Sequence, residues 1–198
     1  MQSVRNIAHL FLSARARAAG IKIGKGVKLS LGGDYMINKT ACATLNDEVW
    51  LAQDHHIEAA DGAEIHIGAN VHFGARARIV AGPQSRIFIK PGCFFNHDTS
   101  IVALNNIVIG ENSIFGPYTY ISDHNHQFAL ERLIKDQLYD TQPLHIGSDV
   151  WLGVGVTILK GADLGDGCVV AARAVVNKQI PRNEVWAGVP AKKIGERH

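Results

Sequence analysis

The sequence predicts an all-β fold of stacked coils, and two observations carry that prediction. A five-residue pattern occurs seven times, with an aliphatic residue first, a small or β-branched residue fifth and, in six copies, Gly, Asn or Asp fourth. The copies start 22, 22, 22, 20, 37 and 18 residues apart, a range typical of proteins whose repeats stack on one another. They begin at Ile23, Leu45, Ile67, Ile89, Ile109, Ile146 and Leu164.

The unit within each copy is a hexapeptide. Another aliphatic or aromatic residue follows six residues after each start, and most copies have a third six further on, as in Ile67, Phe73 and Ile79. Three hexapeptides, about 18 residues, make one turn of a three-sided coil with a short strand on each side. The apolar residues then point inward and stack between coils. Gly, Asn and Asp at the fourth position tolerate the left-handed backbone conformation that tight corners require.

Length and composition are those of one domain. The chain has 198 residues, and 20 Lys and Arg against 18 Asp and Glu give a net charge of +2, without a long basic block for nucleic acid. No apolar stretch is long enough to span a bilayer. Cys93 and Cys168 occupy inward fifth positions, where they act as small apolar side chains, and no CxxC pair occurs. We therefore expect a reduced, cytoplasmic protein.

We expect three segments along the chain. Apolar residues near one face of residues 3–19 predict a helix that covers the open first coil or packs on a neighbouring subunit. A membrane-surface helix that uses its arginines is the alternative, which we do not favour. The segments are an N-terminal helix in 1–20, coils in 21–180 with an insertion at 122–145, and a C-terminal tail in 181–198.

The repeat is interrupted once, after Ile121. The 37-residue interval corresponds to one coil plus an insertion of about 19 residues. A long excursion from a rigid repeat usually carries function rather than packing. The insertion begins with the sequence SDHNH, which includes His124 and His126.

The segment PYTYISDHNH, with VWLG at Val150 and AGVPAK at Ala187, resembles the sugar O-acetyltransferases of the hexapeptide-repeat family. These include galactoside and maltose acetyltransferases and enzymes of surface-polysaccharide gene clusters. The resemblance extends from about Ile65 to the C-terminus; the first 60 residues share only the repeat. It implies a left-handed parallel β-helix of about seven coils, an exception to the right-handed crossover rule. It also implies a homotrimer with each active site between two subunits.

The resemblance makes His124 the general base that takes the proton of an acceptor hydroxyl. The family's commoner Gly-His-Pro is replaced here by Asp123-His124-Asn125-His126, which leaves His126 as a lesser candidate. A hydroxyl is a poor nucleophile at neutral pH, so a base that titrates near pH 7 accelerates its attack by about 10² to 10⁴. The alkoxide attacks the thioester carbonyl of acetyl-CoA, and a backbone N–H would hold the oxyanion.

Three further residues are implied on the acceptor side. The resemblance gives Asn96 a contact with the acceptor hydroxyl, which we count as catalytic together with His124; the alternative is that Asn96 bonds its own backbone. His97 is adjacent and would bind substrate in the same cleft. Asp123 orients a histidine or caps the turn, and the sequence leaves both open. Asn96, His97, Asp123 and His126 are therefore the candidate substrate-binding residues.

The donor side takes residues from the C-terminal coils. Trp151 follows the fifth position of its repeat and should point outward, as a wall for the pantetheine arm by resemblance or as an interface aromatic. Small residues would let acetyl-CoA approach the backbone, and basic residues would bind its phosphates, although such charges are commonly solvated surface. The candidates are Gly153, Ala171, Ala187, Lys178 and Lys192, with Arg182 and Lys193 nearby.

Other functions on the same prism are weaker matches. The γ-type carbonic anhydrases bind zinc through three histidines, two of them five positions apart, and no two of the ten histidines here have that separation. An N-acetyltransferase acting on an amino sugar or other amine, and a non-catalytic scaffold, remain alternatives. We predict an acetyl-CoA-dependent O-acetyltransferase that acts on a sugar or polysaccharide precursor and requires no metal.

Overall fold

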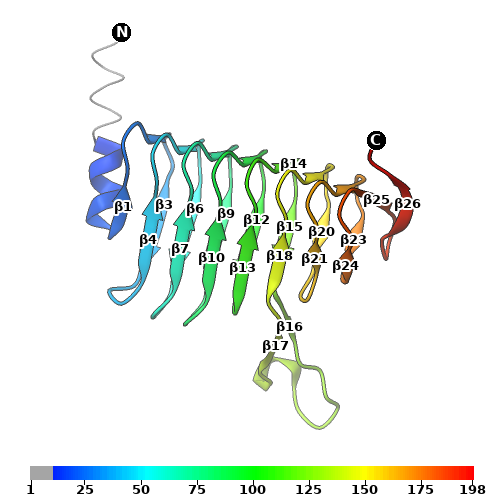
Figure 1. The fold of residues 1–198 in the computed structure, drawn as a ribbon. Helices are drawn as coiled ribbons and strands as arrows, with labels where there is room; N and C mark the ends of the chain where they lie inside the picture. The colour runs from blue at the N-terminus through cyan, green and yellow to red at the C-terminus, as the bar shows by residue number, and fades with distance from the viewer. Residues whose placement is uncertain (1–10) are drawn as a thin grey trace.

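The computed structural model describes residues 11–198, which form a prism of stacked coils capped by a helix (Figure 1). Within these residues, three long sheets make the faces of the prism. Sheet A contains, in order, β1 (Ile21–Ile23), β4 (Cys42–Leu45), β7 (Glu64–Ile67), β10 (Arg86–Ile89), β13 (Asn106–Ile109), β18 (Leu144–Ile146), β21 (Asp163–Leu164) and β24 (Gln179–Ile180).

Sheets B and C have the same stacked order. Sheet B contains β2 (Lys28–Leu29), β5 (Trp50–Leu51), β8 (His72–Phe73), β11 (Phe94–Phe95), β14 (Ile114–Phe115), β19 (Trp151–Leu152), β22 (Val169–Val170), β25 (Glu184–Ala187) and the antiparallel β26 (Lys192–Glu196). Sheet C contains β3 (Asp34–Ile37), β6 (His56–Ala59), β9 (Arg78–Ala81), β12 (Ser100–Ala103), β15 (Tyr120–Ser122), β20 (Thr157–Ile158) and β23 (Val175–Val176). The fold is the predicted left-handed parallel β-helix of about seven coils.

The strand register follows the sequence repeat. Ile65 pairs with Ile87, 22 residues on, whereas Ile146 pairs with Leu164, 18 residues on. The N-terminal coils are therefore four residues longer than the three hexapeptides predicted for a coil. The four residues extend strands of sheets A and C from two residues to four, as in β7 and β9 against β21 and β20. Because two residues are added per strand, each side chain keeps its inward or outward direction.

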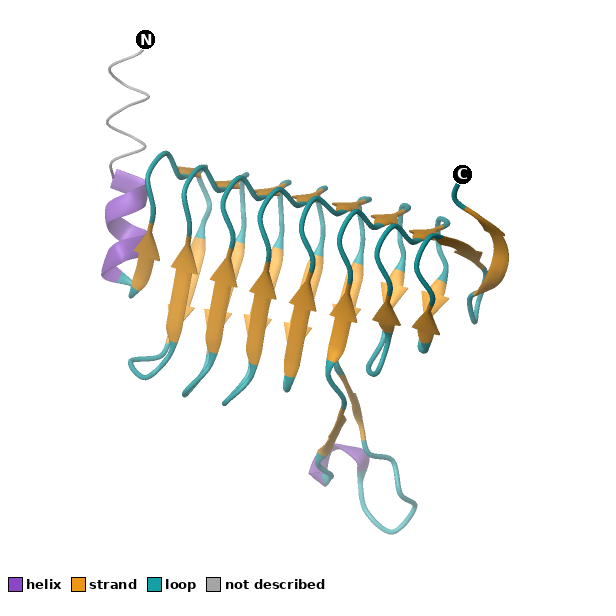
Figure 2. Cartoon of the chain, in the orientation of Figure 1, coloured by secondary structure: helices purple, strands orange, loops and turns teal. Residues whose placement is uncertain are grey.

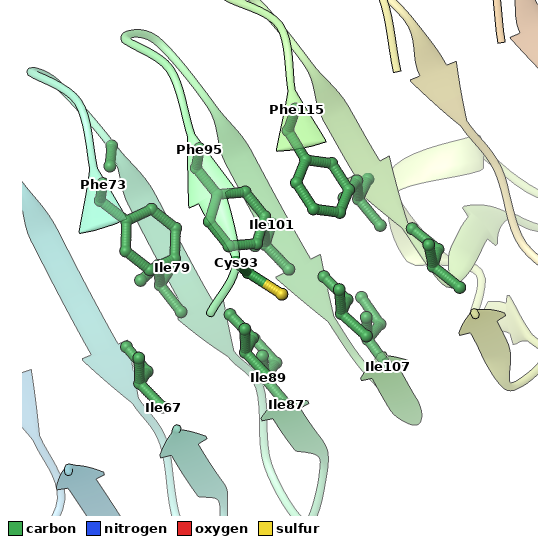
Figure 3. Close-up of a cluster of buried hydrophobic side chains, with 14 of the residues drawn as sticks. Ile67, Phe73, Ile79, Ile87, Ile89, Cys93, Phe95, Ile101, Ile107 and Phe115 are labelled. Carbon is green, nitrogen blue, oxygen red and sulfur yellow. The ribbon is translucent and has the colours of Figure 1, made fainter. Parts of the chain in front are cut away.

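The predicted inward columns form the core. Phe73, Phe95 and Phe115 are fully buried and stack in successive coils, with ring centroids 4.3 and 4.2 Å apart and planes within 5° and 11° of parallel (Figure 3). Cys93 and Cys168 are buried free thiols, as their fifth positions predict. In the phenylalanine column, aromatic rings thus stack directly on one another through three successive coils.

The predicted corners also form. The fourth residue of every copy has a positive φ, between 55° and 76°. Glu48, the one fourth residue that is not Gly, Asn or Asp, adopts φ 57° like the others. The stacking of its coil on its neighbours thus imposes a backbone conformation that glutamate rarely adopts.

The two ends of the prism are covered differently. Residues 11–18 are helical, and Leu12 and Ala16 are buried in the same cluster as the first coil. The rest of the predicted N-terminal helix, residues 1–10, lies outside the described residues. No helix in the described part of the chain is long and apolar enough to cross a membrane. At the other end, β26 folds back on β25.

The insertion forms a hairpin that leaves the prism at the corner between sheets C and A (Figure 2). Its strands β16 (His124–His126) and β17 (Tyr139–Thr141) pair antiparallel, with a short 3₁₀ helix, η1 (Ile134–Asp136), between them. The side chain of Gln137 bonds Ala129 N and O at 2.8 and 2.9 Å, which gives the tip a defined shape.

Candidate functional site

His124 lies at the base of the hairpin, in contact with an acidic neighbour. Its Nδ1 is 3.2 Å from Asp123 Oδ1 and 3.2 Å from Ser122 Oγ, and its side chain is 15% exposed. A carboxylate only accepts hydrogen bonds, so this contact favours the tautomer with hydrogen on Nδ1. Nε2 then carries the lone pair, which is the arrangement that a general base needs.

Asp123 is fully buried and has a partner for each carboxylate oxygen. Oδ1 accepts the N–H of Leu104 and Oδ2 that of Asn105, both at 2.8 Å. These amides belong to the C-to-A turn of the preceding coil. The sequence left open whether Asp123 orients a histidine or caps a turn; its contacts serve both purposes at once.

His126 has a different environment from His124. It is exposed, and its ring lies 4.6 Å from that of Tyr139, its cross-strand neighbour. Tyr139 also contacts the His124 ring edge-on at 5.4 Å. Of the two loop histidines, only His124 contacts a carboxylate within the described residues.

Asn96 and His97 lie at another corner, between sheets B and C. Asn96 Oδ1 accepts the N–H of His97 at 2.8 Å, which is the backbone contact weighed as its alternative role. Strand β12 of sheet C separates this corner from the one that carries the hairpin. One chain therefore does not bring Asn96 and His97 together with His124.

His97 has an acidic partner, Asp98, that is itself paired with Arg76, and neither residue was among the predicted site residues. Asp98 Oδ2 is 2.6 Å from His97 Nδ1, and Arg76 donates to both oxygens of Asp98 at 2.7 and 2.6 Å. These hydrogen bonds from Arg76 hold the pKa of Asp98 at about 2. Arg76 and Asp98 have opposite charges 22 residues apart, one coil of this region, and that spacing was the available signal.

Trp151 points outward from sheet B, as predicted, and is 56% exposed. It is in register with Ile114 of the preceding coil and Val169 of the following coil. Trp50 and Phe94 lie outward on the same column and are also exposed. This apolar strip suits either of the two roles considered for Trp151, a wall for a ligand or an interface between subunits.

The other donor-side candidates lie along the C-terminal coils. Gly153 has a packing reason for its small size, because a Cβ there would come within 2.7 Å of Ala172 N. Lys178 lies at a C-to-A corner, 5.9 Å from the centre of the Trp186 ring. Lys193, in contrast, is paired with Glu184 and Glu196 at 2.8 and 2.6 Å. Ala171 lies at the same B-to-C corner as Gly153, and Ala187 pairs with the exposed Lys192.

Comparison with known proteins agrees with the fold. A family profile described as bacterial transferase hexapeptide (six repeats) matches residues 143–178. The chain is 34% identical over 142 residues to the putative lipopolysaccharide biosynthesis O-acetyl transferase WbbJ of Escherichia coli, covering 68% of this chain and 72% of that one. The chain belongs to the hexapeptide-repeat acyltransferase family.

Two further acetyltransferases match over different shares of their length. A probable acetyltransferase of Mycobacterium tuberculosis, Rv3034c, is 35% identical over 136 residues, which cover 68% of this chain but 45% of the relative. The structure of a galactoside acetyltransferase in complex with coenzyme A aligns with a TM-score of 0.52 and 26% identity. That alignment covers 85% of this chain and 66% of the other.

Proposed function

We propose that this protein is an acetyl-CoA-dependent O-acetyltransferase that acts on a hydroxyl of a sugar or polysaccharide precursor. The observation that carries the proposal is the buried Asp123 beside His124 on a hairpin that leaves the prism of a hexapeptide-repeat acyltransferase. The relatives named for lipopolysaccharide and galactoside acetylation support a sugar acceptor. The buried free thiols support action in a reducing compartment, the cytoplasm.

In the proposed reaction, His124 Nε2 removes the proton of the acceptor hydroxyl as its oxygen attacks the thioester carbonyl carbon. The tetrahedral intermediate collapses with cleavage of the carbon–sulfur bond. The imidazolium then returns the proton to the departing thiolate, which gives the acetyl ester and free CoA. Asp123 keeps Nδ1 protonated and offsets the positive charge that the ring carries between these steps.

We further propose that the site is completed by a second copy of the chain in a homotrimer. His124 and Asn96 lie on different corners of one prism, whereas a closed ring places the C-to-A corner of one copy against a different face of the next. Asn96 and His97 would then contact the acceptor from the neighbouring copy. Trp151, Gly153, Ala171, Ala187, Lys178 and Lys192 are the proposed contacts for acetyl-CoA.

The first experiment is calorimetric titration of the protein with acetyl-CoA and with CoA, without acceptor. We expect saturable binding close to one ligand per chain, followed by acetylation in a screen of sugars that includes amino sugars. Binding without acetylation of any hydroxyl would turn attention to the amine acceptors. A folded protein that binds neither ligand would contradict the proposal.

The second experiment tests the base. His124→Ala should lower kcat by about 10² or more while the dissociation constant for CoA stays within about twofold, because the histidine acts in the chemical step. His126→Ala removes the lesser candidate on the same strand and should lower kcat much less, because only His124 of the two contacts a carboxylate within the described residues. Equal losses in the two variants, or a loss of CoA affinity in His124→Ala, would contradict the assignment.

A further inference from the structure

The hairpin that carries His124 takes the place of a corner turn, and the turns of the coils on either side lie against it. In the preceding coil the equivalent turn contains Leu104 and Asn105; in the following coil it contains Lys160 and Gly161. Within the hairpin, His124 pairs with Thr141 and Asn125 pairs with Asp140. A contact made to β17 therefore acts on the strand that holds the base.

Both neighbouring turns bond β17 through a side chain. From the preceding coil, Asn105 Nδ2 donates to Thr141 Oγ1 at 3.1 Å. From the following coil, the Lys160 ammonium donates to the carboxylate of Asp140. The hairpin is thus fastened on two sides, once by a neutral hydrogen bond and once by an ion pair.

We propose that Lys160 is a positioning residue for His124, acting through Asp140 and the β16–β17 pairing. The proposal rests on the proposed function. It assigns a task to a lysine that lies outside the inserted loop and that no sequence motif singles out.

The burial of Lys160 supports this role over that of a surface charge. Its side chain is only 18% exposed, and Asp140 is the anionic group that it contacts within the described residues. A partly desolvated ammonium interacts more strongly with its partner than an exposed one does. Removal of the charge at position 160 would leave, among the described residues, the side-chain contacts of Asn105 and Asp123 as anchors of the hairpin.

Catalysis is sensitive to such an anchor because a general base must lie within hydrogen-bond reach of the proton that it removes. A shift of about 1 Å can lower the rate by as much as about 10²-fold. The donor-side candidates, in contrast, lie on the coils, so a change at the hairpin base leaves them in place.

The test compares Lys160→Met with Lys160→Arg and with Lys135→Met. Methionine keeps much of the length and removes the charge, arginine restores the charge, and Lys135 is an exposed lysine on η1 of the same hairpin. For Lys160→Met we expect kcat to fall about 10- to 100-fold with the Michaelis constant for acetyl-CoA within about twofold. Lys160→Arg and Lys135→Met should stay near the wild-type values.

Hydrogen exchange supplies a readout that does not need activity. The amide of Gln127 bonds Leu138 O across the hairpin at 3.0 Å, and its exchange should accelerate at least about tenfold in Lys160→Met. The double variant Lys160→Glu with Asp140→Lys, which reverses the pair, should recover protection and part of kcat. Lys135→Met should leave exchange at Gln127 unchanged.

The outcomes separate this proposal from the proposed function. Unchanged exchange in Lys160→Met, or faster exchange with unchanged kcat, would overturn the positioning role. A fall in kcat without faster exchange would also overturn it, because Lys160 would then act on the substrate itself. If the wild-type protein acetylates no acceptor, the proposed function fails, and the exchange measurement still decides whether Lys160 anchors the hairpin.

Discussion

The buried ring of His55 makes the stability of this protein depend on pH. It is 1% exposed in the second coil, its Nδ1 lies 2.6 Å from Ala52 O, and its Nε2 lies 2.8 Å from the Tyr35 hydroxyl. The carbonyl only accepts, so Nδ1 carries the hydrogen and Nε2 accepts from Tyr35. Burial lowers the pKa of His55 and raises that of Tyr35 to about 12. Burial therefore favours the neutral imidazole in the folded protein.

This predicts a loss of stability in mild acid. A lowered pKa in the folded state means that the unfolded chain, whose histidine titrates near about 6.5, binds the proton more tightly. The contribution of His55 to the free energy of unfolding is therefore complete above about pH 6.5 and declines as the pH falls toward the lowered folded-state value.

Denaturant unfolding at pH 7.5 and 5.5 measures this effect. The wild-type protein should lose more stability between these two pH values than a His55→Gln variant does, because glutamine does not titrate. The difference between the two proteins in this pH-dependent change cancels the contributions of the other histidines, which both proteins share. The same pH dependence in both proteins would contradict the assignment.

At the candidate site, the sequence predicted some of the residues but not the contacts that hold them. His124 became a candidate because its segment interrupts a regular repeat and resembles a family motif, and Asp123 because it is adjacent to His124 in the chain. The bonds from Leu104 and Asn105 to Asp123, and from Arg76 to Asp98, join residues 18 to 22 positions apart. Such contacts depend on the stacking register of the coils, which the residue pattern indicates only approximately.

At the scale of the strand and turn, the repeat made prediction reliable. Inward columns and corners recur in every coil. One irregular residue therefore does not change the predicted fold, because the other six copies still show the pattern. The length of the N-terminal coils was not predicted, because the four added residues preserve the alternation of inward and outward side chains. The conformation of the hairpin was not predictable either, since it occurs once and has no other copy for comparison.

The irregular corner at Glu48 gives a stability prediction. Its left-handed backbone costs a side chain with an ordinary Cβ about 1 kcal/mol, and asparagine tolerates that conformation better. Glu48→Asn should therefore raise the free energy of unfolding by up to about 1 kcal/mol. Glu111→Asn, one position earlier in another copy and without a positive φ, is the control that should show no such gain. A destabilised Glu48→Asn protein would contradict the prediction.

The phenylalanine column gives a second prediction at this scale. Phe95 stacks between Phe73 and Phe115 and is fully buried, so Phe95→Ala leaves a cavity with rings on both sides. We expect a loss of about 3–5 kcal/mol in the free energy of unfolding, and a smaller loss for Phe95→Leu. Chemical denaturation of the three proteins measures the difference. Equal losses for alanine and leucine would mean that stacking rather than cavity volume dominates.

For the whole molecule, the separation of Asn96 from His124 on one prism makes the assembly the decisive question. In a closed ring, each site would combine the hairpin of one copy with the B-to-C corner of the next. A trimer that mixes His124→Ala chains with Asn96→Ala chains then contains one site in which both residues are intact.

Mixed trimers should therefore recover about a third of wild-type activity when each parent is impaired. The two variants, carrying different tags, are co-expressed and the mixed species purified through both tags. A mixture of His124→Ala with the double variant His124→Ala and Asn96→Ala has no intact site and is the control. Activity no greater than the average of the parents would place the whole site within one chain.

The register of the strands also determines which changes in chain length this protein tolerates. Removal of a complete coil of 22 residues brings equivalent residues of its neighbours into contact and shortens the prism by one strand spacing, about 4.8 Å. Removal of a single residue from a strand, by contrast, would turn the following inward side chains toward solvent. Insertion or deletion of a complete coil, or of two residues within a strand, would therefore preserve the inward and outward directions of the side chains. The hairpin would stay at the corner between sheets C and A.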